Sequence, residues 1–242
     1  MRPTRSDHSA AFLRSFAVQG SWNYRTMIGG GIAYALAPLL ARIYAGNPVA
    51  LRQALERHAS AFNAHPYLSS LAVGALARVE HEGHDPETIN RFRTALRGPL
   101  GAIGDQAVWA GWRPLCFLSA ILAFCLGLDA RAAALGLVLL YNLGHVSLRW
   151  WGYRRGWREG LDVGRVLTRS PLKRIAQRLV PVNQALMGAV LALLLIRMPG
   201  GTGGAEMVVS AVVVGLGAYF LPAAGAVLAM TLLFGACLAL IL

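Results

Sequence analysis

The polar and aromatic residues at positions 19–24 have the side chains best suited to bind a hydroxyl-rich ligand. Gln19, Ser21 and Asn23 carry donors and acceptors, and Trp22 offers a flat apolar face on which a pyranose ring can stack. A site that hydrogen-bonds hydroxyl groups rejects analogues strongly, because they leave its polar groups unpaired. The alternative is structural, with these residues capping neighbouring helices and anchoring Trp22 at the headgroup level of a membrane.

Two further polar residues are candidates for the same site. Asn63, in the sequence FNAHP, either lines the site or bonds to local backbone near Pro66. Asp105 ends the glycine-rich sequence GPLGAIGD, just before an apolar run, and an acid beside membrane segments is by default a functional residue. We expect a re-entrant loop there. The alternatives for Asp105 are a helix N-cap and an ion pair with Arg113.

The histidines and cysteines predict no metal or cofactor site. His58 and His65 are seven residues apart, but Pro66 interrupts the helical pattern and no third ligand is nearby. Cys116, Cys125 and Cys237 lie in apolar runs without a CxxC pair, so a disulfide framework is not expected either. A membrane enzyme that uses Asp105 with a histidine stays as an alternative, although no nucleophile elbow or phosphate loop supports it.

Composition predicts the elements that must position these residues. Of 242 residues, 56% are hydrophobic and 14% are charged, whereas soluble domains have about 45–50% apolar and roughly 25% charged residues. Charges are sparse at 114–148 and 181–242. We therefore predict an all-α integral membrane protein. It has an N-terminal interfacial or cytoplasmic helical region, a re-entrant glycine-rich segment and about four to five membrane helices.

The charge pattern predicts a division of the chain and its orientation. We expect an N-terminal helical region at 1–113 and membrane helices at 114–242, with a basic cytoplasmic segment at 149–178. That segment contains nine of the Lys and Arg residues behind the net charge of +12. Nucleic-acid binding is one interpretation of this positive charge. The basic segment lies between apolar blocks, however, which favours the positive-inside rule, so we expect no nucleic-acid partner. The N-terminus lacks an apolar signal-peptide core and is expected in the cytoplasm.

Local signals predict several helices. Asn47 and Asp85 are suited to cap helices at 48–58 and 86–96, each of which starts with a proline. The apolar runs 114–128 and 132–150 predict a helical hairpin with its turn at 129–131. A membrane helix is expected at 181–198, and further apolar segments lie at 207–221 and 223–242.

Four ordered sequence blocks within about residues 11–165 resemble one known family. The blocks are FLRSFAVQGSWNY, LRQALERHASAFNAHP, GPLGAIGDQAVWAGWRP and YNLGHVSLRWWGYRRGWREGLD. They resemble the motifs of the IID subunits of the mannose/fructose/sorbose phosphotransferase family. The matching positions include Arg14, Gln19, Gly20, Ser21, Trp22, Asn23, Tyr24, Arg57, His58, Phe62, Asn63, Pro66, Gly98, Pro99, Gly104, Asp105, Trp109, Arg113, Pro114, Asn142, Arg149, Gly152, Tyr153 and Gly156.

The resemblance implies a subunit of a sugar transporter in the bacterial inner membrane. Such a subunit pairs with a IIC membrane subunit to bind and translocate a hexose, in a higher oligomer of IIC–IID pairs. A partner IIAB protein, or separate IIA and IIB proteins, supplies the phosphoryl group from a histidine, so no phosphoryl-carrying residue is expected in this chain. The resemblance makes Gln19, Trp22, Asn23, Asn63 and Asp105 the candidate substrate-binding residues.

The sequence also departs from the family pattern. His145 and Gln106 stand where the family usually has Arg and Pro, and the polar insertion after the helix at 181–198 is reduced to PGGTGGAE. The alternative function is therefore a reduced IID-like scaffold that recruits regulators through 149–178 without transport.

Overall fold

The computed structural model describes residues 1–196. Every regular element in that part of the chain is a helix, and the β-structure there consists of two isolated bridges, so the predicted all-α class is confirmed.

The chain divides into two compact units, each made of two chain segments. Unit 1 contains Met1–Asp105 and Gly144–Lys173, and unit 2 contains Gln106–Leu143 and Arg174–Leu242. The chain returns to unit 1 within a single long helix, α7.

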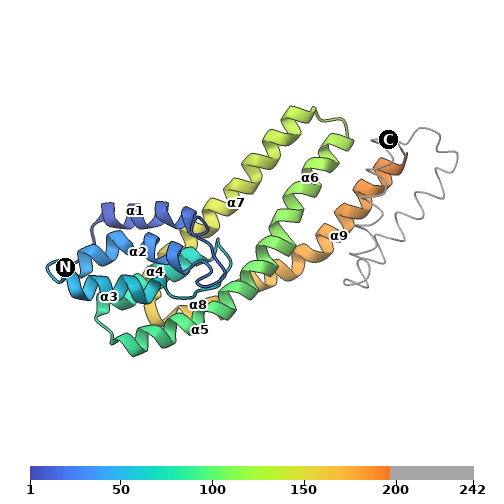
Figure 1. Ribbon diagram of the computed structural model, residues 1–242. Helices are drawn as coiled ribbons and strands as arrows, with labels where there is room; N and C mark the ends of the chain where they lie inside the picture. The colour runs from blue at the N-terminus through green and yellow to red at the C-terminus, as the bar shows by residue number, and fades with distance from the viewer. Residues whose placement is uncertain (197–242) are drawn as a thin grey trace. The chain divides into compact units, whose positions relative to one another are not determined.

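Unit 1 is a bundle of helices, most of them short (Figure 1). Its helices are α1 (Arg5–Arg14), α2 (Gly29–Ile43), α3 (Pro48–Ala59), α4 (Ser69–Glu82), α5 (Pro86–Gly104), the end of α7 (Ala130–Glu159) and α8 (Val163–Arg169), with single 3₁₀ turns η1 (Ser15–Ala17) and η3 (Gly160–Asp162). Two loops, 18–28 and 60–68, separate α1 from α2 and α3 from α4.

Capping residues start these helices where the sequence places them. The Asn47 side chain accepts from the Ala50 amide at 3.0 Å, and the Asp85 side chain accepts from the Thr88 amide at 2.9 Å. Each satisfies a backbone donor that the first helical turn leaves open. The two predicted N-caps are therefore confirmed.

The core of unit 1 is built on α4, which is almost wholly buried. Gly74 of α4 and Gly156 of α7 allow these two helices to touch backbone to backbone. A Cβ at Gly74 would collide with the backbone at Tyr153 and Trp157, and a Cβ at Gly156 would collide with Leu71 and Ala75. Small residues permit such close helix crossings, and these two positions fix where α7 packs on α4.

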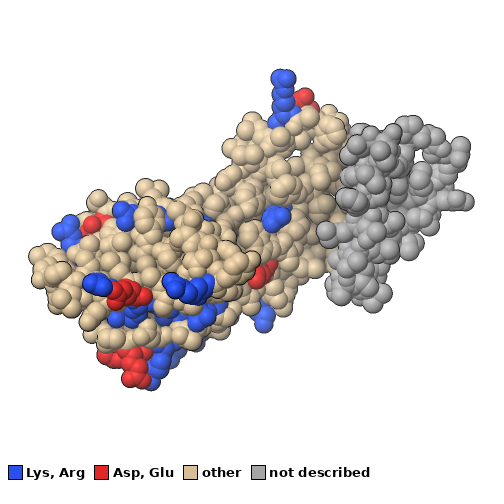
Figure 2. All heavy atoms as spheres, in the orientation of Figure 1, with Lys and Arg blue, Asp and Glu red and all other residues tan. Residues whose placement is uncertain are grey.

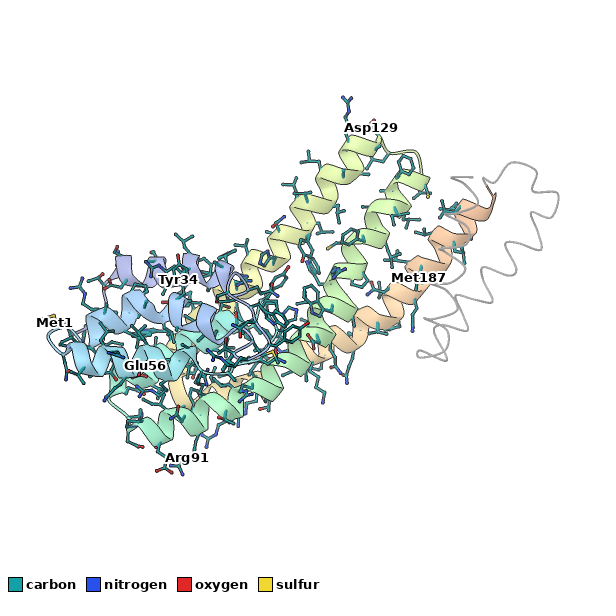
Figure 3. All side chains as sticks on the ribbon, viewed as in Figure 1. Met1, Tyr34, Glu56, Arg91, Asp129 and Met187 are labelled. Carbon is teal, nitrogen blue, oxygen red and sulfur yellow. The ribbon has the colours of Figure 1, made fainter. Side chains whose placement is uncertain are left out.

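Unit 2 contains a helical hairpin, as predicted. α6 (Arg113–Cys125) and α7 are joined by a turn in which Gly127 adopts a φ of +102°. Asp129, at the tip of the hairpin (Figure 3), caps α7 by accepting from the Arg131 amide at 2.9 Å. Large apolar side chains on the α7 arm are exposed, among them Leu135, Leu139 and Leu143. An uncovered apolar helix face requires a lipid or protein neighbour.

The expectation of a re-entrant glycine-rich loop is wrong. The chain stays helical from α5 through a π-helical segment, η2 (Asp105–Trp112), into α6. Glycine has low intrinsic helix propensity, but packing overrides it here. Gly111 lies against Leu179 of α9 (Leu172–Ile196), and the Asn183 side chain of α9 donates to the Ala110 and Gly111 carbonyls at 3.1 and 2.9 Å.

Two helical stretches among residues 1–196 are long and apolar enough to cross a membrane: Pro86–Cys125 and Ala130–Leu194. In the view of Figure 2, charged side chains gather over the helices of unit 1 and at the tip of the hairpin. The basic segment 149–178 is helical, but Arg149 is buried and so does not belong to a solvated basic surface. The predicted helix at 181–198 falls in α9 as far as Ile196. Residues 197–198 and the predicted segments 207–221 and 223–242 lie outside the described residues.

Candidate functional site

The loops 18–28 and 60–68 lie side by side in unit 1. The Phe62 amide donates to the Thr26 carbonyl at 3.1 Å, and the Ile28 amide donates to the Phe62 carbonyl at 3.0 Å. The Phe62 ring is fully buried beneath the pair. These bonds bring Asn63, which is exposed, next to the segment that carries the first group of candidate residues.

The side chain of Asn23 holds the first loop in shape. Its amide donates to the Thr26 hydroxyl at 2.7 Å and to the Ser21 carbonyl at 3.1 Å. Its carbonyl oxygen accepts from the amides of Arg25 and Thr26 at 3.0 and 2.9 Å. All these partners lie within three residues, which is the local bonding that asparagine favours in turns. Asn23 therefore positions its neighbours.

The exposed part of that loop is aromatic. Trp22 is 46% exposed, and its ring meets the Tyr24 ring edge to face at 4.9 Å between centroids. Gln19 is exposed in the preceding turn, where the Trp22 amide donates to the Gln19 carbonyl at 3.1 Å. The loop and the turn before it thus expose an indole ring and a side-chain amide, two groups suited to a sugar-contact surface.

Asp105 is connected to these loops through His65. Gly104, at the end of α5, packs so closely on the His65 side chain that any Cβ there would overlap it. Asp105 follows directly and is exposed. The second loop therefore touches both the Trp22 loop, through Phe62, and the residue before Asp105, through His65.

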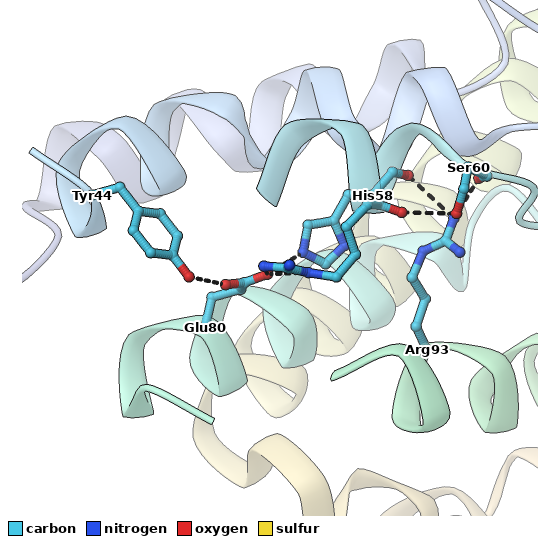
Figure 4. Close-up of polar contacts among 6 residues, drawn as sticks. Tyr44, His58, Ser60, Glu80 and Arg93 are labelled. Carbon is cyan, nitrogen blue, oxygen red and sulfur yellow. Dashed lines mark hydrogen bonds and ion pairs between the residues drawn. The ribbon is translucent and has the colours of Figure 1, made fainter. Parts of the chain in front are cut away.

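A buried ionic network lies behind the loops (Figure 4). Glu80 of α4 accepts at one carboxylate oxygen from His58 Nε2 at 2.7 Å and from Arg57 Nη2 at 2.7 Å. Its other oxygen accepts from the Tyr44 hydroxyl. Burial alone raises the pKa of a carboxyl, but the hydrogen bonds from His58, Tyr44 and Arg57 hold the pKa of Glu80 at about 2. Burial and the bond to Glu80 raise the pKa of Tyr44 to about 12.

His58 serves this network as a neutral donor. Burial lowers its pKa, and an ionised Glu80 can only accept, so the imidazole proton is on Nε2. Arg93 of α5 continues the network toward the second loop. Its guanidinium donates to the carbonyls of His58 and Ser60 and lies 5.1 Å from the centre of the Phe62 ring. Charged groups from three helices thus fix the backbone at the start of that loop.

A second cluster is centred on the buried Arg149 of α7 and contacts η1 and the second loop. Arg149 donates to the Ser15 carbonyl at 2.6 Å and to His145 Nε2 at 2.7 Å. Its guanidinium lies over the rings of Phe16 and Tyr67 at 4.8 and 5.0 Å, and His145 stacks on Tyr67 with centroids 4.0 Å apart. Stacking of this kind orients a guanidinium.

Comparisons with known proteins agree with this fold and these motifs. The family model of the PTS system mannose/fructose/sorbose family IID component matches residues 3–236. The chain belongs to this IID family. Its relatives include the mannose-specific EIID component of the Escherichia coli phosphotransferase system, 29% identical over 195 residues that cover 77% of this chain and 67% of that protein. The fructose permease IID component of Bacillus subtilis is 28% identical over 79% of this chain and 70% of that protein.

A solved structure shows the same fold. The structure of the mannose transporter ManYZ in complex with microcin E492 contains a chain that matches with a TM-score of 0.61 and 28% identity, over 78% of this chain and 70% of that chain. A second solved membrane protein matches with a TM-score of 0.70. This IID chain is therefore a membrane subunit of a mannose-family phosphotransferase system and a bacterial inner-membrane protein. It spans about two thirds of the length of the curated relatives it matches.

The structure separates the histidines that the sequence places close together. His58 lies in α3 and binds Glu80, whereas His65 lies in the second loop and accepts from the Tyr67 amide at 3.2 Å. Both are almost fully buried, so neither is placed to take a phosphoryl group from another protein. Among residues 1–196, no group of three His, Cys, Asp or Glu side chains could hold a metal ion.

Sequence reasoning missed the two supporting clusters. Glu80 was not singled out, and Arg149 was assigned to the basic cytoplasmic segment. His58 and Arg149 both occur in the family-like blocks. Each partner is far away in the sequence, since Arg149 and Ser15 are 134 residues apart, and local patterns do not predict such pairs.

Proposed function

We propose that this IID chain pairs with a IIC subunit to bind and translocate a hexose, which a IIAB protein phosphorylates. The observation that carries the proposal is the match to a solved mannose transporter over most of both chains. Relatives of this chain are named for mannose, fructose and sorbose, which makes these three sugars the first to test.

The sugar-contact residues of the proposal lie on the two-loop surface. Gln19, Trp22 and Asn63 are exposed on the loops, and Asp105 is exposed at the end of α5. Their side chains offer amide, carboxylate and aromatic groups suited to hydroxyls and a sugar ring. Asn23 contributes by keeping Trp22 in place through its four local hydrogen bonds.

The proposed topology follows the charge pattern. Residues 149–178 and the N-terminus lie on the cytoplasmic side, because basic segments that flank membrane helices stay there. Residues beyond the two apolar stretches at 86–125 and 130–194 complete about four to five membrane helices. Several IIC–IID pairs then assemble into a higher oligomer.

Binding of labelled mannose, fructose or sorbose by the purified IIC–IID pair tests the proposal. Specific binding by the pair, absent from either subunit alone, is the expected result. The alternative, a scaffold without transport, predicts that the pair assembles and recruits IIAB but binds none of the sugars. An enzyme that uses Asp105 would instead act on its substrate in the absence of IIC.

A further inference from the structure

A half-open cavity of about 380 Å³ lies within unit 2, between the η2–α6 segment and α7. Trp109, Arg113 and Phe117 line it on one side, and Leu137, Val138 and Tyr141 line it on the other. Its size falls within the range of about 300–1,000 Å³ that is usual for small-molecule sites. The two-loop surface of the proposed sugar site contributes none of these residues.

One positive charge stands among the apolar walls of this cavity. Among the lining residues that the structure describes, Arg113 alone is charged, and its guanidinium lies 5.3 Å from the centre of the Trp109 ring. Within residues 1–196, no carboxylate lies at ion-pair distance from Arg113. Arg113 is exposed on the chain itself, but an arginine placed within a membrane pairs with an anionic partner. The cavity therefore favours a ligand with one negative charge and an apolar body.

The position along the hairpin sets the depth of the cavity in a membrane. Arg113 is 13 residues from Leu126 at the hairpin turn, or about 20 Å along α6 at roughly 1.5 Å per residue. With the tip at one interface and a hydrocarbon core of about 30 Å, Arg113 lies in the opposite half of the bilayer, where its long side chain can snorkel outward.

Aromatic residues mark the same depth. Trp109 and Tyr141 line the cavity, and the Trp112 indole beside them donates to the Tyr141 carbonyl at 3.4 Å. Trp and Tyr gather at membrane interfaces, which places the cavity mouth near the headgroups. Farther along α7 from the tip, the basic segment 149–178 follows, so this is the cytoplasmic side in the proposed topology. The cytoplasmic leaflet is the one in which basic pockets meet anionic headgroups.

We propose that this cavity binds one anionic phospholipid. The phosphate group pairs with Arg113, and an acyl chain lies along Phe117, Leu137 and Val138. The proposal rests on the membrane placement of the proposed function, but it assigns a ligand that is neither the sugar nor a protein partner. An acidic side chain of the IIC subunit is the competing occupant, and the experiment below separates the two.

Native mass spectrometry of the delipidated IIC–IID pair, with phosphatidylglycerol or phosphatidylcholine added, tests the proposal. We expect the wild-type pair to retain phosphatidylglycerol in preference to phosphatidylcholine. Arg113→Gln should lower the retention of phosphatidylglycerol about fivefold, which corresponds to about 1 kcal/mol for one basic residue at an anionic surface. Arg113→Lys should keep most of it, because the charge remains.

Arg131→Gln is the matched control, since Arg131 lies at the other end of the same hairpin and is exposed. It should leave retention unchanged. Equal retention by wild type and Arg113→Gln, or equal binding of the two lipids, would overturn the proposal. Dissociation of the IIC–IID pair on Arg113→Gln would also overturn it, because the partner of Arg113 would then be the IIC subunit. Displacement of the lipid by inorganic phosphate alone would overturn it as well. No sugar is present, so failure here is separate from failure of the transport proposal.

Discussion

The two units of this IID chain satisfy their polar groups in different ways. In unit 1, the buried charges have polar partners within the unit: Glu80 binds Arg57 and the neutral His58, and Arg149 donates to His145. In unit 2, the described helices expose large apolar side chains, and the polar groups are few and attached to helix carbonyls, as Asn183 is. Unit 1 therefore contains the partners that fix its loops, whereas unit 2 is completed by lipid or protein neighbours. The proposed sugar surface lies on the self-contained unit.

The largest expected effect is loss of the Glu80 carboxylate. Glu80→Ala leaves Arg57 and the buried His58 without their acid, and breaking a buried ion pair costs about 3–5 kcal/mol. Thermal unfolding of the purified pair should begin at a clearly lower temperature. Glu56→Ala, which removes an exposed i,i+4 pair with Arg52, is the control and should change little. Equal effects of the two substitutions would mean that unit 1 does not depend on its buried network.

The second-largest expected effect is a loss of stability of unit 1 at acid pH. Burial, with Arg149 and His145 nearby, lowers the pKa of His65 from 6.5 to about 4. The unfolded chain then binds more protons between these values, so stability is complete above about pH 6.5 and is lost as the pH falls toward 4. The low pKa of Glu80 extends the loss from about 4.5 to about 2. The midpoint of thermal unfolding should fall as the pH is lowered across this range, and it should fall less steeply in His65→Gln.

Asp105→Asn tests the exposed acid at the end of unit 1. We expect uptake to fall about five- to tenfold, because a hydrogen bond to a charged group exceeds a neutral one by about 1–1.5 kcal/mol. Membrane abundance should stay the same, since the side chain is exposed and keeps its size. Asp85→Asn is the matched control, because Asp85 is an exposed helix cap and Asn caps a helix about as well as Asp. It should change neither uptake nor membrane abundance. A parallel fall of uptake and abundance would assign Asp105 to folding.

The smallest effect belongs to unit 2. Asn183→Ala removes two bonds to the carbonyls of Ala110 and Gly111, and side-chain bonds in membrane proteins average about 0.6 kcal/mol each. We expect a loss of about 1 kcal/mol, visible as a modest drop in the unfolding midpoint. Asn142→Ala, whose bond is to a carbonyl of its own helix, should change less. A loss as large as that of Glu80→Ala would erase the contrast between the units.

Much of the fold follows from local sequence signals. Asn47, Asp85 and the turn at Asp129 set helix starts that the structure confirms, because a cap acts within three residues of itself. The glycine-rich segment near Asp105 was mispredicted, because contacts with α9 and His65 override glycine propensity and no local pattern encodes them. The family-like blocks contain the residues of the two loops. The contacts by which Glu80 and Arg149 support these loops join residues far apart in the chain, so local patterns did not predict them.

Hexose uptake by membrane vesicles tests directly whether this chain and its IIC subunit together transport a sugar. Vesicles that contain this chain and its IIC subunit are supplied with IIAB and a phosphoryl donor and given labelled mannose, fructose or sorbose. We expect at least one sugar to accumulate as its phosphate, only when both membrane subunits are present. We expect Trp22→Ala to lower this uptake without lowering membrane abundance. Equal accumulation in vesicles that contain IIC and lack this chain would contradict the account.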